Sequence, residues 1–171
     1  PVGARPCPAR GSGDGTGALM PELSSPHLYS LLTRLHGHLG WLGLALMLHP
    51  VISLGRPGRP TRSTRWSAWL AAAFVSTPFA LGWLAYPTYR ARVKPALLVD
   101  AHAHAMAFET KEHLALMTLA LAWGGALALY ASGTDPRGRR VARVLFACGA
   151  LTGFTTGILG VLVAARAHSY W

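Results

Sequence analysis

The sequence predicts an all-α membrane protein, a four-helix bundle built from two tandem helical hairpins. Three observations predict this fold: long uncharged apolar blocks, a low charged fraction and self-similarity between the two halves. Of the 171 residues, 51% are hydrophobic and 13% are charged, whereas roughly a quarter are charged in an ordinary soluble domain. Continuous apolar blocks argue against a β-barrel, in whose strands apolar and polar residues alternate over about 10 residues.

The first two helices are expected over about 28–54 and 66–86. A helix needs about 20 residues to cross a hydrocarbon core about 30 Å thick. The first apolar block reaches that length only because residues 28–38 extend it. The second block carries no charge, and Pro78 inside it is expected to kink the helix.

The other two helices are expected over about 103–132 and 141–166. Stretches rich in Gly, Pro and charged residues join the four helices and are predicted to be loops or turns. These stretches are residues 55–65, 86–100 and 132–140. Residues 28–171 therefore form one transmembrane domain.

The N-terminal residues 1–27 are predicted to be a disordered tail. Residues 1–19 are rich in Gly, Pro and Arg and lack the apolar core of a signal peptide. Met20 precedes a plausible start, so residues 1–19 are expected to be an upstream extension rather than native sequence.

The net charge of +10 is expected to anchor the protein in the membrane rather than to bind nucleic acid. The arginines stand at the ends of apolar blocks, where they set topology. They concentrate in the first and third loops, at positions 56, 59, 62, 65, 137, 139 and 140. These loops are therefore predicted to face the cytoplasm, with both termini and the middle loop outside a cell inner membrane.

An internal repeat is predicted at a spacing of 75 residues. Between positions 38 and 84, fifteen of 47 residues are identical to their partners 75 positions on, where composition alone gives roughly 10%. The predicted repeats cover about 28–95 and 103–168. Two such hairpins are related by a pseudo-twofold axis along the membrane normal. His38 and His113 are matched partners and are expected to face each other across it.

The histidines are the candidate cofactor ligands. Ionisable groups at membrane depth normally face the bundle interior. His36 and His38 are two residues apart and point about 200° apart on a helix, so only one can face inward. The repeat selects His38. Two imidazoles across a bundle axis suit axial ligation of haem iron. His38 and His113 are therefore predicted to bind haem b.

Neighbouring residues support a haem site. Gly82 and Gly157 leave room for a flat macrocycle, and Phe79 and Phe154 could pack on its edge. Arg34 and Lys111 are candidates to meet its propionates at the water boundary. The paired histidines, paired glycines and helix count resemble those of four-helix membrane b-type cytochromes. This resemblance implies electron transfer near the outer membrane face, with quinol or a periplasmic redox protein as partner, in a redox protein or oxidoreductase subunit.

A non-haem metal site is the first alternative. Zn, Cu or Fe would need three or four ligands, and Glu109, Glu112, His102 and His104 could add to the histidine pair. Glu109 could instead orient the ring of His113 or pair with Arg34, its repeat partner.

A cofactor-free structural subunit is the second alternative. In that case the histidines are interfacial polar residues, and His49 caps a helix end. The small residues Gly149, Gly153 and Gly157 would then pack against a helix of another membrane subunit. The tryptophans, Trp41 among them, are assigned to the interfacial belt and to no cofactor.

Overall fold

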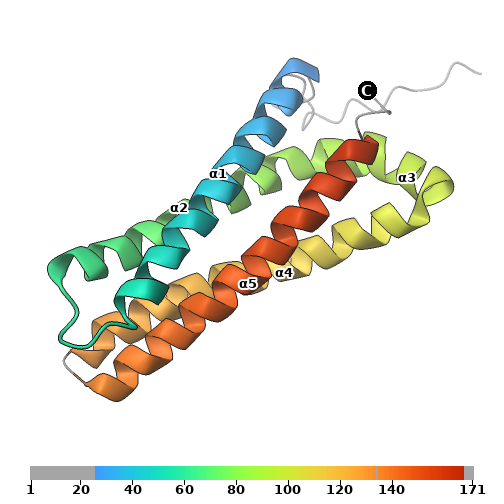
Figure 1. Cartoon of the computed structure of the whole chain (residues 1–171). Helices are drawn as coiled ribbons and strands as arrows, with labels where there is room; N and C mark the ends of the chain where they lie inside the picture. Colours follow the sequence, from blue (N-terminus) through green and yellow to red (C-terminus); the bar gives the residue numbers. More distant parts are fainter. Residues whose placement is uncertain (1–25, 134, 168–171) are drawn as a thin grey trace, which may run out of the picture.

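A computed structural model describes residues 26–133 and 135–167 of the chain (Figure 1). The predicted N-terminal tail, apart from its last two residues, and His168 lie outside the described residues. The long helices are α1 (Pro26–Ser53), α2 (Arg62–Thr88), α4 (His102–Ser132) and α5 (Pro136–Ala167). A π-helical turn, η1 (Tyr89–Val93), and a short helix, α3 (Lys94–Asp100), connect α2 to α4.

Within the described residues, four helical segments are long and apolar enough to cross a membrane. They are His27–Ser53, Arg62–Asp100, His102–Ser132 and Pro136–Ala167. Large apolar side chains such as Trp83, Leu151 and Val161 are exposed on them, as expected where lipid replaces water as the solvent. These findings confirm, for the part of the chain that the structure describes, the predicted all-helical class with four candidate membrane spans.

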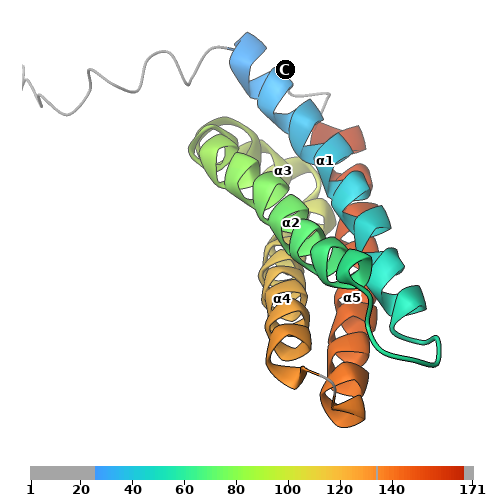
Figure 2. The same cartoon turned by 90° about the vertical axis from the view of Figure 1, so that its left-hand side faces the viewer.

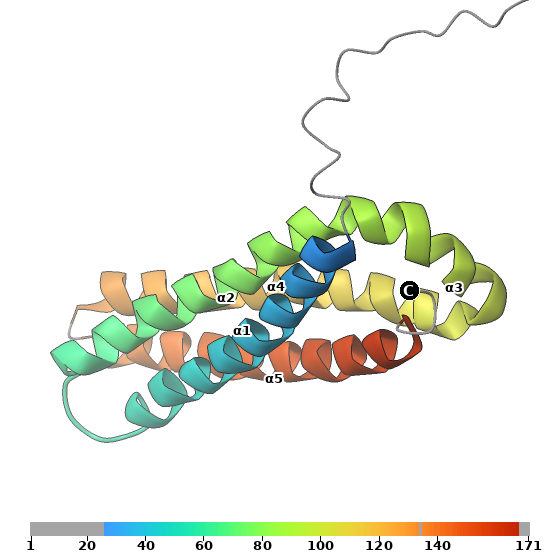
Figure 3. The same cartoon turned by 90° about the horizontal axis from the view of Figure 1, so that it is seen from above.

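The four long helices form a ring. Helix α1 packs mainly on α2 and α5, and α4 packs mainly on α5 and α2. Helices α1 and α4 therefore occupy opposite corners. The α1–α2 loop and the α4–α5 turn lie at one end of the bundle, here called the arginine-rich end, and α3 lies at the other end (Figures 2 and 3).

The middle connection is helical, so the expected loop over 86–100 is wrong. Helix α2 continues through η1 into α3, and the chain turns at Ala101, whose φ is −152° and ψ is 58°. Pro95 does not stop this continuation. It directly follows the π-helical turn η1, and a proline inside a helix can kink it or shift its hydrogen bonding without ending it.

Helices α2 and α5 also begin several residues earlier than predicted, because polar side chains cap them. The Thr61 hydroxyl accepts the backbone N–H of Thr64 at 3.2 Å. The Asp135 carboxylate accepts the backbone N–H groups of Arg137 and Gly138, each at 3.1 Å. Such caps satisfy N–H groups that have no partner within the helix.

The small-residue face of α5 is already occupied inside the bundle, which corrects its assignment to a partner subunit. A Cβ atom added at Gly149 would lie 2.5 Å from Met47 Cε, and one at Gly153 would lie 3.2 Å from Thr118 Cγ2. At Gly157 it would lie 3.1 Å from the Trp41 ring. These glycines therefore bring α5 close to α1 and α4 of the same chain.

Two apolar clusters hold the bundle together. The first lies toward the arginine-rich end and includes Met47, Ala72 and Phe146. The second includes Tyr89 and Val163 and joins η1 and α3 to α4 and α5. A cavity extends from the first cluster to the second, since Met47, Tyr89 and Val163 all line it.

Candidate cofactor cavity

The cavity lies within the ring of long helices and has a volume of about 590 Å³. Sites for cofactors and other small molecules typically measure about 300–1,000 Å³ and combine apolar walls with a few polar groups. The walls here are mostly apolar or aromatic, and the polar side chains come chiefly from α1 and α4. Those with ionisable groups other than tyrosine are His36, Lys111, Glu112 and His113.

His36 is held against α2 on one side of the cavity. Its Nδ1 atom lies 2.7 Å from the carbonyl oxygen of Pro78. Gly82, one turn further along α2, makes room for the ring, because an added Cβ would lie 3.0 Å from His36 Cε1. If Nδ1 carries the proton and donates it to this carbonyl, Nε2 keeps its lone pair. This is the usual arrangement of a metal-binding histidine.

His38 lies elsewhere, so the expectation that the repeat turns it inward is not met. Its side chain is exposed and does not line the cavity. Its Nδ1 atom lies 2.8 Å from the carbonyl oxygen of Arg34, one turn earlier in the same helix. The two-residue spacing did separate His36 from His38, but the inward ring is that of His36.

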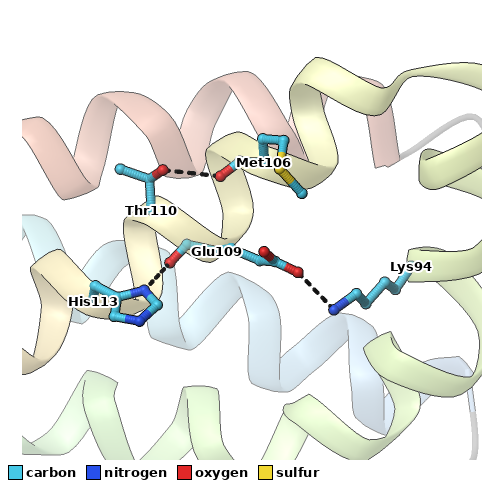
Figure 4. Close-up of polar contacts among 5 residues, drawn as sticks. All are labelled: Lys94, Met106, Glu109, Thr110 and His113. Atoms are coloured by element: carbon cyan, nitrogen blue, oxygen red, sulfur yellow. Dashed lines mark hydrogen bonds and ion pairs between the residues drawn. The ribbon is translucent and has the colours of Figure 1, made fainter.

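His113 lines the cavity from α4, and its exposed ring is held in the same local way as that of His38. Its Nδ1 atom lies 2.7 Å from the carbonyl oxygen of Glu109 (Figure 4). The Glu109 carboxylate forms an ion pair with Lys94 at 2.8 Å instead. Glu109 therefore contacts His113 through its backbone and not through its carboxylate, and its ionic partner is Lys94 rather than Arg34.

Lys111 occupies the position equivalent to His36 in the predicted repeat, since 36 plus 75 is 111, and it also lines the cavity. Its Nζ atom lies 4.8 Å from the centre of the Phe108 ring, within the range of a cation–π contact. Glu112 lines the cavity beside it. The cavity thus has a cationic group that could meet an anionic substituent of a bound molecule.

Aromatic rings close the end of the cavity next to α3. The rings of Tyr89 and Phe108 stack with centroids 3.7 Å apart, and the centroid of the Tyr86 ring lies 6.4 Å from that of Phe108. The Tyr89 hydroxyl is buried and has no hydrogen-bond partner within the described parts of the chain. Sequence reasoning missed this cluster because Tyr89 was expected in a loop.

Trp41 was assigned to the interfacial belt, but it also lines the cavity. Its indole packs on Gly157 and meets the Phe154 ring edge-on at a centroid distance of 6.0 Å. The pairing of a large ring with a glycine on α5 could have been proposed from the sequence only if the packing of α1 on α5 had been known.

The remaining predicted site residues divide into two groups. Phe79, Gly82, Gly157, Lys111 and Glu112 line the cavity. Arg34, His102, His104, Glu109 and Phe154 do not line it. Within residues 26–133 and 135–167, no group of three or more His, Cys, Asp or Glu side chains could hold a metal ion.

Comparisons with known protein families, with curated proteins and with solved structures find no match to this chain.

Proposed function

We propose that this chain is an integral membrane protein that binds haem b in the cavity and transfers electrons. The observation that carries the proposal is the pair of imidazoles on the cavity, His36 from α1 and His113 from α4. Each has its Nδ1 atom at a backbone carbonyl, 2.7 Å away in both cases. Each Nε2 atom is thereby available as a ligand. His36 replaces His38 in the ligand pair expected from the sequence.

We favour haem over a bare metal ion because haem needs fewer protein ligands. A structural zinc ion is usually held by four protein ligands, and the described part of the chain has no group of even three. A porphyrin supplies the remaining nitrogens itself, so two imidazoles suffice. Phe79 adds an aromatic side chain to the lining, and Lys111 is a candidate partner for a propionate. Gly82 and Gly157 also line the cavity, but they make room for the His36 ring and the Trp41 indole.

A duplicated hairpin is part of the proposal. The ring order α1–α2–α4–α5 is the order that a twofold axis along the bundle would produce. His38 and His113 make the same contact with the carbonyl four residues earlier, and His36 and Lys111 line the cavity at equivalent positions. These likenesses support a common origin of the two halves.

The arginine-rich end would face the cytoplasm of a cell inner membrane, following the positive-inside rule. Residues such as Thr33, Tyr86 and Ala164 line the cavity in the half of the bundle away from the arginine-rich end, so the haem would lie near the outer face. Quinol or a periplasmic redox protein would then be the electron partner. When bound, the iron supplies reversible electron transfer. His36 and His113 would hold it, the apolar walls of the cavity would shield it from water, and Lys111 would compensate the charge of a propionate.

The proposal is tested on full-length protein purified from cells supplied with a haem precursor. Porphyrin and metal contents are measured together. We expect haem iron in stoichiometric amount with the chain, reduced strongly by His36→Ala or His113→Ala and retained in His38→Ala. Stoichiometric Zn, Cu or Fe without porphyrin would support the non-haem alternative. Neither metal nor porphyrin would support a cofactor-free subunit.

A further inference from the structure

The arginine-rich end contains a second cavity, separate from the cofactor cavity. It has a volume of about 320 Å³ and lies within the α1–α2 loop. Arg56 and Arg59 line it from the loop, and Arg139 lines it from α5. The Arg139 guanidinium donates a hydrogen bond to the carbonyl oxygen of Gly58, which ties this loop to the second hairpin. The other polar side chains on the lining are those of His49, Ser53, Thr61, Ser63 and Thr64.

Positive charge at this end has almost no negative counterpart. No acidic residue lines the cavity. Across residues 53–65 and 135–143 the sequence has eight arginines and one acid, Asp135, whose carboxylate caps α5. The ion pair found in the described parts of the chain, Lys94–Glu109, lies at the opposite end. An anion from outside the chain would therefore lower the electrostatic energy of this end.

The position of the cavity favours a lipid as the source of that anion. Trp66, in the first turns of α2, is 58% exposed, and exposed tryptophans near helix ends mark the level of lipid headgroups. Leu48 and Ile52 are also exposed and are next in sequence to the cavity residues His49 and Ser53. A headgroup in the cavity could thus have its acyl chains beside an apolar surface of α1.

We infer that this cavity binds the phosphate of an anionic phospholipid. Basic pockets beside membrane helices recognise such headgroups, and each arginine near the surface contributes on the order of 1 kcal/mol. The three arginines and the Ser63 hydroxyl would donate hydrogen bonds to the phosphate oxygens. The bound lipid would join the α1–α2 loop to α5.

The test is a titration of the full chain, solubilised in a neutral detergent, with short-chain phosphatidylglycerol, followed by native mass spectrometry. Arg56→Gln/Arg59→Gln removes two charges from the cavity. Arg62→Gln/Arg137→Gln removes two charges from exposed positions at the same end that do not line it. We expect the first pair to weaken phosphatidylglycerol binding roughly 30-fold and the second pair to leave it nearly unchanged.

Three results would overturn the inference. Equal losses in both double variants would mean diffuse attraction to surface charge. Phosphatidylcholine binding as tightly as phosphatidylglycerol would mean that the net charge of the headgroup is not recognised. Inorganic phosphate that displaces phosphatidylglycerol at equal concentration would identify free phosphate as the ligand. Thermal unfolding of each variant without lipid checks that it folds, and none of these outcomes depends on haem.

Discussion

The Nδ1 atom of His36 lies 2.7 Å from the carbonyl oxygen of Pro78, 42 residues further along the chain. This contact fixes the rotation of α1 against α2, and with it the identity of the histidine that lines the cavity. Gly82 permits the contact because a side chain there would meet the imidazole ring.

Gly82→Ala is expected to displace the His36 ring, because the new Cβ would lie 3.0 Å from Cε1. Overpacking costs about 1–3 kcal/mol, partly offset by the roughly 1 kcal/mol by which alanine favours a helix. We expect a net loss of unfolding free energy, measured by SDS titration with tryptophan fluorescence. In a His36→Ala background the same change should be neutral or stabilising. An equal loss in both backgrounds would contradict the contact.

Glu109→Gln is expected to leave the His113 site intact. The Lys94–Glu109 ion pair is partly exposed, with side chains 28% and 41% accessible, and such pairs contribute little to stability. The carbonyl that contacts His113 is retained in any residue at position 109. The unfolding free energy should change little, and the cofactor content should stay the same. Loss of the cofactor would show that the carboxylate itself positions the imidazole.

Gly124 and Gly125 are neighbours in α4 that should respond oppositely to alanine. At Gly125 a Cβ would lie 2.9 Å from the fully buried Phe146 ring, whereas at Gly124 the nearest atom, Leu145 Cδ1, is 3.6 Å away. We expect Gly125→Ala to destabilise the bundle by about 1–3 kcal/mol. Gly124→Ala should be neutral or stabilising by up to about 1 kcal/mol. Similar effects in SDS titrations of the two variants would refute this packing of α4 on α5.

Tyr89→Phe is expected to stabilise the cofactor-free protein by about 1 kcal/mol. The change keeps the ring that stacks on Phe108 and removes a buried hydroxyl that has no partner in the described parts of the chain. Tyr130→Phe is the control, because Tyr130 is exposed and its loss should change little. Thermal unfolding of the two variants makes the comparison. Destabilisation by Tyr89→Phe would reveal a hydrogen bond from this hydroxyl.

Helix number and approximate position could be predicted from the sequence because length and apolarity alone decide whether a segment can cross a bilayer. Helix ends were less predictable. The caps at Thr61 and Asp135 extend α2 and α5 into stretches that looked like loops. Pro95 lies in the stretch that was expected to be a loop, but the helix continues through it after the π-helical turn η1.

The inward faces of the helices could not be predicted reliably. In a soluble helix the polar face marks the outside, but in a membrane both the lipid-facing and the packed faces are apolar. The choice between His36 and His38 therefore depended on a repeat argument. In the structure, the His36 ring lines the cavity because it contacts Pro78 and Gly82, which lie on another helix. Lys111, Gly82 and Phe79 were identified from the sequence and do line the cavity.

The most direct test of the proposed function is the visible spectrum of purified full-length protein before and after reduction with dithionite, compared between His36→Ala and His38→Ala. We predict a Soret band and a sharp α band on reduction in the native protein and in His38→Ala, with both bands lost or strongly altered in His36→Ala. A native protein without either band would contradict haem binding. Bands retained in His36→Ala but lost in His38→Ala would contradict the assignment of His36 as the ligand.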